Sequence, residues 1–223
     1  MKIYSLILQF FLMLFPWRIR KIMLNSFLKM KIDKGAKIGF SIILAKRVHL
    51  LQDSVIGNFN FINRIDLLIL KKRAKLGRRN WITGISIESG AYKASPNRKC
   101  EFILGNDSRV TDRHFIDCNG GVIIGDFTTI AGIGTQIISH GINVLNSEQE
   151  TDYVNIGDYC FIGTRCVFLK GTKIPNFCVL GAGSVVTKKN ETEYKLYGGV
   201  PAKEIKFLNK DSKYFSRKEG NVK

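Results

Sequence analysis

The sequence has few of the residues that build disulfide frameworks or metal sites. Its five cysteines are an odd number, and no two form a Cys-x-x-Cys pair. We therefore expect small core residues in a reducing compartment rather than a disulfide framework. The only histidines are His49, His114 and His140, and their spacing is not that of a zinc-binding pair, so no metal is expected.

The sequence also lacks a hydrophobic run long enough to cross a membrane. The apolar stretch at residues 3–15 is shorter than the roughly 18 residues needed, and no signal-peptide cleavage site follows it. Basic residues and Trp17 come next, which leaves two interpretations of a helical segment over residues 1–30. Residues 1–24 could lie on a membrane surface, or the segment could cap the structure that follows. We predict a cytoplasmic protein, with peripheral contact at the inner face of the cytoplasmic membrane left open.

Acidic residues are scarce. The sequence has 18 Asp and Glu residues but 35 Lys and Arg residues, which gives a formal net charge of +17. An excess of this size predicts an anionic partner, such as cofactor phosphates, a nucleotide, an anionic glycan or an acidic membrane surface. The sequence has no helix-turn-helix, zinc-finger or aromatic RNA-binding signature, so we expect no nucleic acid partner.

What the sequence does have is a six-residue period. This period matches neither a helix nor a simple strand, and predicts a very short strand followed by a turn, repeated many times. Glycine often follows the apolar residue, where it allows backbone angles that a side chain resists. The periodic apolar positions are Ile32, Ile38, Leu44, Leu50, Ile56, Ile62 and Leu68, and later Ile156, Ile162, Phe168, Ile174, Leu180 and Val186.

The rows IGDYCF, IGTRCV, IPNFCV and LGAGSV resemble those of the hexapeptide-repeat acyltransferases. The resemblance implies a mainly β protein, a left-handed parallel β-helix in which about eighteen residues make one triangular coil. It also implies a homotrimer. We expect the β-helix over residues 31–190, with excursions at 86–101 and 140–153. A segment that contacts CoA and a loose charged tail are expected over 191–223.

Residues 131–141, AGIGTQIISHG, are similar to the active-site rung of the family members that O-acetylate surface polysaccharides. The resemblance makes His140 the general base that takes a proton from a sugar hydroxyl as it attacks acetyl-CoA, without an acyl-enzyme. It also implies a catalytic role for Asp117, which either contacts the sugar or oligosaccharide acceptor or steadies His140. His114 and Asn119 are candidates for acceptor binding, with a packed histidine and a turn residue as the structural alternatives.

The acetyl-CoA contacts of the family map onto the last coils and onto the segment GVPAK at residues 199–203. The lysines of that region would pair with the CoA phosphates. The preceding loop, NETEYKLY, departs from the Pro-rich turn of relatives. The residues that the resemblance implies for acetyl-CoA binding are Thr164, Ala182, Thr187, Lys188, Lys203 and Lys206.

Two other functions remain open at this stage. The same histidine base would serve N-acetylation of a nucleotide-linked amino sugar, although the nucleotide-sugar domain that usually precedes such β-helices is absent. A non-catalytic β-helix that binds glycan or membrane is an alternative of another class. His140, the excursion after it and the GVPAK segment together favour an enzyme.

Overall fold

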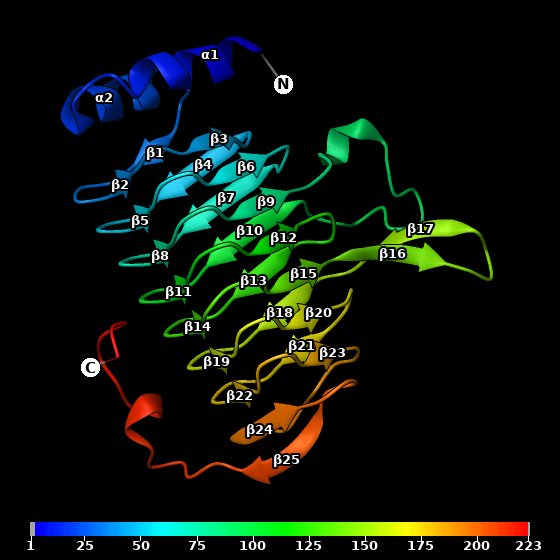
Figure 1. Ribbon diagram of the computed structural model, residues 1–223. Coiled ribbons are helices and arrows are strands. Elements are labelled where there is room, and N and C mark those ends of the chain that lie inside the picture. The colour runs from blue at the N-terminus through cyan, green and yellow to red at the C-terminus, as the bar shows by residue number, and fades with distance from the viewer. Residues whose placement is uncertain (1–2, 223) are drawn as a thin grey trace.

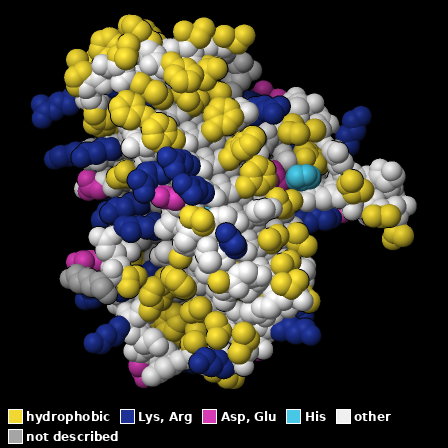
Figure 2. Space-filling view, viewed as in Figure 1, with side chains coloured by type: hydrophobic (Ala, Val, Ile, Leu, Met, Phe, Trp, Pro, Cys, Tyr) yellow, Lys and Arg dark blue, Asp and Glu magenta, His cyan; other side chains and the backbone are white. Residues whose placement is uncertain are grey.

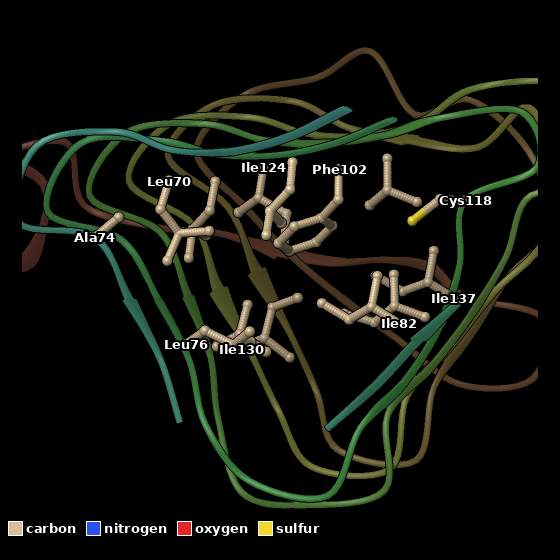
Figure 3. Close-up of a cluster of buried hydrophobic side chains, with 14 of the residues drawn as sticks. Leu70, Ala74, Leu76, Ile82, Phe102, Cys118, Ile124, Ile130 and Ile137 are labelled. Atoms are coloured by element: carbon tan, nitrogen blue, oxygen red, sulfur yellow. The ribbon is translucent and has the colours of Figure 1, made fainter. Parts of the chain in front are cut away.

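The computed structural model describes residues 3–222, so residues 1, 2 and 223 of the predicted terminal segments lie outside the description. Parallel strands form three sheets, and the chain passes from one sheet to the next in every coil (Figure 1). Seen along the coils, the backbone traces a triangle around the buried side chains (Figure 3). The predicted mainly β fold, a left-handed parallel β-helix with a helical N-terminal segment, is confirmed.

The strands are short, mostly two to four residues each. The first sheet contains β1 (Lys31–Ile32), β4 (Arg47–Leu50), β7 (Leu67–Leu70), β10 (Glu101–Leu104), β13 (Val122–Ile124), β18 (Val154–Ile156) and β21 (Lys173–Ile174). The second contains β2 (Lys37–Ile38), β5 (Val55–Ile56), β8 (Lys75–Leu76), β11 (Arg109–Val110), β14 (Thr129–Ile130), β19 (Phe161–Ile162), β22 (Val179–Leu180), β24 (Lys195–Gly198) and the antiparallel β25 (Lys203–Phe207). The third contains β3 (Ile42–Leu44), β6 (Phe61–Asn63), β9 (Trp81–Thr83), β12 (Phe115–Asp117), β15 (Gln136–Ile138), β20 (Val167–Phe168) and β23 (Val185–Val186).

The periodic apolar residues stack from coil to coil inside the triangle. Ile116 pairs in register with Ile82 on one side and Ile137 on the other, and all three are fully buried. Ile82 and Ile137 lie close together inside the triangle in Figure 3. Full burial of such a side chain contributes about 1.5–3 kcal/mol to the stability of the fold. A shift in register would expose these side chains, so the six-residue period sets the register. All five cysteines are buried and free, as predicted.

Helices α1 (Ile3–Leu12) and α2 (Trp17–Phe27) cover the open end of the first coil (Figure 1). Part of this contact is polar. Gln9 Nε2 donates to the Ile43 carbonyl oxygen at 2.9 Å, and Gln9 Oε1 accepts the Ile43 backbone N–H at 2.9 Å. Arg20 donates to the carbonyl oxygens of Ile38 and Gly39. These contacts satisfy backbone groups that an uncovered coil would leave without partners. Within residues 3–222, no helix is long and apolar enough to cross a membrane.

The prediction of a loose C-terminal tail is wrong. Residues 209–222, with the short 3-10 helix η2 (Lys213–Phe215), fold back onto one corner of the coils. The Tyr214 hydroxyl donates to the Cys160 carbonyl at 3.0 Å, and Phe215 is buried. The tail packs against a ladder of stacked rings at that corner, made of Phe127, Tyr159, Phe177 and Tyr194.

Candidate active site

Two side chains far apart in the sequence meet at the corner where the third sheet ends. Strand β12 ends at Asp117, which pairs in register with Ile138 of β15 in the next coil. Two residues after Ile138, His140 begins an arm that leaves the coils, formed by the antiparallel strands β16 (His140–Asn143) and β17 (Glu148–Thr151) (Figure 1). The register brings Asp117 Oδ2 to 2.5 Å from His140 Nδ1 across 23 residues of sequence.

Asp117 is buried and fully engaged as an acceptor. Its Oδ1 accepts the backbone N–H of Asn119 at 3.0 Å, and its Oδ2 accepts the N–H of Ser139 at 3.0 Å. With only 1% of its surface exposed, the carboxylate has no access to an acceptor substrate. Of its two predicted roles, the geometry therefore favours steadying His140 over contacting the acceptor.

The same hydrogen bond fixes the tautomer of His140. A carboxylate only accepts, so Nδ1 carries the proton and Nε2 presents its lone pair. The side chain of His140 is 41% exposed, and no residue in the 3–222 range hydrogen-bonds to Nε2. The hydrogen bond to Asp117 raises the pKa of His140 above its ordinary value, and partial burial opposes that shift without reversing it. Asp117 and His140 thus form a dyad in which Nε2 of His140 is free to accept a proton.

The excursion between β9 and β10, residues 84–100 with the 3-10 helix η1 (Ile87–Ser89), packs over this dyad. The ring of Tyr92 lies 6.0 Å from the ring of His140 and is almost completely buried. Ser95 Oγ accepts the N–H of Thr151 at 2.9 Å and donates to its carbonyl at 3.2 Å. Because Thr151 pairs with His140 in the arm, the excursion contacts both the ring and the strand partner of His140.

A buried arginine holds the excursion in place. Arg98 lies over the Tyr92 ring at 5.0 Å and donates to the carbonyl oxygens of Ile85, Ser86 and Asn119. The Asn119 side-chain oxygen in turn accepts the N–H of Ile85 at 2.7 Å. Asn119, which the sequence made a candidate for acceptor binding, is thus a buried connection between the excursion and the Asp117 turn.

His114 belongs to a different arrangement, a column of polar side chains inside the corner between the second and third sheets. Its Nδ1 accepts the N–H of Thr135 at 3.1 Å, and its Nε2 lies 3.0 Å from Thr111 Oγ1. Burial lowers the pKa of His114 to about 4, so the ring stays neutral near pH 7. Neither ring nitrogen is left for an acceptor, and the structure favours the packed alternative over acceptor binding.

Comparison with known proteins agrees with the repeat and the fold. Residues 153–188 match the family model described as the hexapeptide repeat of succinyl-transferase. The predicted six-residue repeat in this part of the chain is thereby confirmed as a hexapeptide repeat. The chain is 24% identical over 161 residues to the galactoside O-acetyltransferase of Escherichia coli (strain K12), and the match covers 72% of this chain and 77% of that protein.

A solved structure shares the fold of this chain, and a second is reported beside it. The polysialic acid O-acetyltransferase OatWY superposes with a TM-score of 0.56 at 17% identity, covering 80% of this chain and 84% of that one. The acetyltransferase VCA0836 of Vibrio cholerae, solved in complex with acetyl-CoA, gives a TM-score of 0.44 at 16% identity, with 92% and 85% covered.

The residues that the resemblance implies for acetyl-CoA form three groups in the structure. Thr164 and Ala182 occupy the corner between the second and third sheets, where Gly183 N–H donates to the Thr164 carbonyl at 2.9 Å. Thr187 and Lys188 follow β23, at the same corner as His140 and two coils further on. Lys203 and Lys206 are exposed on β25. Only the second group shares a corner with the dyad.

Three residues of the site were missed in the sequence: Tyr92, Ser95 and Arg98. The break in the six-residue period marked their segment as an excursion but gave no signal for where it packs. Tyr92 has a positive backbone φ of 59°, which residues other than glycine rarely adopt. The sequence did not indicate this conformation.

Proposed function

We propose that the protein transfers the acetyl group of acetyl-CoA to a hydroxyl of a sugar unit in surface polysaccharide biosynthesis. The observation that carries the proposal is the Asp117–His140 dyad, whose geometry leaves Nε2 as a free base at the root of the arm. The galactoside and polysialic acid O-acetyltransferases among its relatives support a sugar acceptor and O-acetylation.

The mechanism needs no covalent intermediate with the protein. Nε2 of His140 takes the proton of the acceptor hydroxyl as its oxygen attacks the thioester carbonyl, and Asp117 stabilises the imidazolium that forms. The C–S bond then breaks, and the imidazolium returns the proton to the CoA sulfur, giving an acetyl ester and free CoA. All five cysteines are buried, and burial raises the pKa of Cys100 and Cys178 to about 11, which argues against a thiolate nucleophile.

Acetyl-CoA would bind through the groups that the resemblance assigns. The lysines on β25 match CoA phosphates in charge, and the basic character of the chain favours capture of an anionic substrate. Thr187 and Lys188 would bring the pantetheine end along the corner that leads to His140.

The proposal is tested by supplying purified protein with acetyl-CoA and hydroxyl or amino acceptors in parallel, and measuring CoA release. We expect release with hydroxyl sugars. Release only with a nucleotide-linked amino sugar would instead establish N-acetylation, and no release with any acceptor would favour a binding scaffold. Deletion in the source organism followed by mass analysis of its glycans should show the loss of one acetyl mass from a surface polysaccharide.

The excursion should matter for turnover rather than for substrate binding. Tyr92→Ala removes the ring beside His140, and because a misplacement of 1 Å can cost about 10²-fold, we expect kcat to fall by up to that factor. The KM for acetyl-CoA should stay unchanged. Tyr92→Phe keeps the ring and should retain near-normal kcat; if it loses as much as Tyr92→Ala, the packing account of this residue is wrong.

The protein is proposed to be a homotrimer. Figure 2 shows the arm projecting from the body of the molecule with apolar side chains near its end. In the single chain Val144 is 86% and Leu145 95% exposed, in the turn between β16 and β17. A neighbouring copy would cover these side chains and close a groove beside His140. Light scattering should give three times the chain mass, and Val144→Ser with Leu145→Ser should weaken the assembly. A stable monomer at micromolar concentration would contradict this prediction and remove a shared substrate site.

The helical cap is proposed to contact an anionic membrane surface as well. Ile7, Phe10 and Phe11 of α1 are exposed, whereas Gln9 and Leu12 are buried. Figure 2 shows apolar side chains gathered over the helical end of the molecule. One basic residue near an anionic surface adds about 1 kcal/mol to membrane binding, and Arg18 is exposed on α2, the helix that follows α1. Full-length protein should float with anionic vesicles, and changing Ile7, Phe10 and Phe11 to Ser should abolish flotation.

The matched control for flotation is Val222→Ser, a change of similar polarity at an exposed site in the tail. These substitutions spare Gln9 and Arg20, which tie the helices to the first coil, so the fold should remain intact. Wild-type protein that stays in the soluble fraction would leave capping as the function of the helices.

A further inference from the structure

A cavity of about 750 Å³ lies between the helical cap and the excursion that packs over the dyad (Figure 1). Part of its lining comes from residues 4–5 of α1 and from residues 27–30 at the end of α2. Residues of the excursion, within 85–89, line it as well. The coils contribute Ile43 and Ile65, whose side chains are buried. Three segments that are far apart in the sequence therefore enclose one space with an apolar floor.

Basic side chains also line this cavity. Lys29 and Arg64 are exposed, and neither forms an ion pair with a carboxylate among residues 3–222. Lys46 lines the cavity too, but its Nζ is engaged, at 3.1 Å from Asp66 and 2.6 Å from Glu88. Two cations are therefore available beside an apolar floor. This combination matches an amphiphile whose headgroup is anionic, because charge would hold the headgroup while the hydrocarbon covers the apolar lining.

The exposed apolar face of α1 continues into the cavity. Tyr4, Ile7 and Phe11 follow one another at intervals of three and four residues, so they share one face of the helix. All three are exposed, and Tyr4 also lines the cavity. This is the face proposed above to contact an anionic membrane surface. A lipid chain could therefore lie along α1 while its headgroup occupies the cavity.

The cavity lies on the same corner of the coils as the dyad. Strands β6, β9, β12 and β15 pair in register, from Asn63 at one end to Ile138 at the other. Arg64 directly follows Asn63, and His140 lies two residues after Ile138. Three strand spacings of about 4.8 Å place Asn63 and Ile138 about 14 Å apart. A phosphate at Arg64 and a hydroxyl at Nε2 of His140 would thus be joined through a few sugar units rather than one.

We propose that this cavity binds the phosphorylated headgroup of a lipid, and that this lipid carries the acceptor glycan. The inference rests on the proposed function, because it names the form in which the acceptor reaches His140. The phosphate pairs with Lys29 and Arg64, and the first part of the hydrocarbon chain covers Ile43 and Ile65. The rest of the chain follows α1 into the bilayer, and the sugar units extend along the corner to the dyad.

The lining favours a lipid over a soluble glycan as the occupant. A free glycan would supply no hydrocarbon for the apolar floor and would make no use of the exposed face of α1. An anionic lipid satisfies both the two available cations and the apolar lining, and it brings its sugar units to the corner of His140 from the membrane side.

The binding test uses three probes on the full-length protein: dodecyl phosphate below its micelle concentration, inorganic phosphate, and dodecyl maltoside, which has the same chain but a neutral headgroup. The wild type should bind dodecyl phosphate more tightly than either of the others in calorimetric titrations. Lys29→Gln and Arg64→Gln should each weaken that binding by about fivefold. Ala45→Trp, which fills part of the cavity without changing its charge, should weaken it as well.

The matched control is Arg79→Gln. Arg79 is an exposed arginine at a turn of the coils with a φ of 57°, close to the 56° of Arg64, but it does not line this cavity. Its variant should bind dodecyl phosphate like the wild type. Equal binding of the three probes, or wild-type affinity in both Lys29→Gln and Arg64→Gln, would overturn the inference.

Acetyl transfer separates this inference from the proposed function. The wild type should have a lower KM for an oligosaccharide joined to dodecyl phosphate than for the same oligosaccharide free in solution. The ratio of the two kcat/KM values should fall about fivefold in Arg64→Gln and stay at the wild-type value in Arg79→Gln. If dodecyl phosphate binds but no acceptor is acetylated, the proposed function fails and the lipid site stands. Equal KM for both acceptors, or a smaller assembly of Arg64→Gln in light scattering, would overturn the inference.

Discussion

The His140→Ala variant is expected to lose acetyl transfer by about 10²–10⁴-fold, the range for removing a positioned acid–base group. His140 presents a free Nε2 whose partner nitrogen is held by Asp117, whereas His114 is buried with both ring nitrogens engaged. The rate of CoA release with a hydroxyl acceptor measures the effect.

Binding of acetyl-CoA supplies the control for this variant. The contacts assigned to acetyl-CoA lie on later coils, so its affinity should change little in His140→Ala. Turnover near the wild-type level would remove His140 from the mechanism. A joint loss of turnover, acetyl-CoA binding and assembly would instead identify His140 as a structural residue.

The Asp117→Asn variant is expected to lose transfer by about 10²-fold, less than the full loss from removing the base. An amide can still accept one of the two backbone N–H groups that Asp117 holds, but it no longer provides a charge to orient and stabilise the imidazolium. The loss should appear in kcat, measured with saturating acetyl-CoA and acceptor.

A conservative change nearby provides the matched control for Asp117→Asn. Ser139→Ala removes the hydroxyl, which donates to Asp117 at 3.4 Å and accepts the Gly120 N–H at 2.8 Å, but leaves the Ser139 backbone N–H that donates to Asp117 at 3.0 Å. This variant should retain most activity. If it loses as much as Asp117→Asn, the effect reflects disruption of the turn and not loss of the carboxylate.

The repeating part of the fold could be predicted because one physical rule governs every coil. Each apolar residue of the hexad packs on its counterpart one coil away, so a side-chain pattern visible in the sequence is sufficient to set strand, register and core. His140 was a candidate because the rung that it ends resembles the family's active-site rung and because it borders an excursion from the pattern; its catalytic role stays a prediction.

The surroundings of the dyad could not be predicted because they depend on irregular backbone. Tyr92 and Ser95 reach His140 and Thr151 through a segment without a period, held by buried hydrogen bonds from Arg98 to three carbonyl groups. Arginine is usually solvated, and nothing in its sequence neighbourhood marks it as buried. The packed tail was missed for a similar reason, since its charged residues obscure the few aromatic side chains that bind it to the corner.

The assignment of His114 shows how composition alone can mislead. It stands in the slot of the hexad that elsewhere holds Asn80 and Thr135, small polar residues that hydrogen-bond the next coil. A histidine in that slot is a candidate for acceptor binding in the sequence, with a packed histidine as the structural alternative. Its position in the repeat, more than its chemistry, indicates its structural role.

The pH dependence of kcat/KM tests the central claim most directly, when measured for the wild type and both dyad variants. A general base must be neutral to act, so the wild-type rate should rise with pH through the pKa of His140, which Asp117 raises above the ordinary value of about 6.5. This rise should shift to lower pH in Asp117→Asn and be absent in His140→Ala. A rise at the same pH in all three proteins would contradict the role of the dyad.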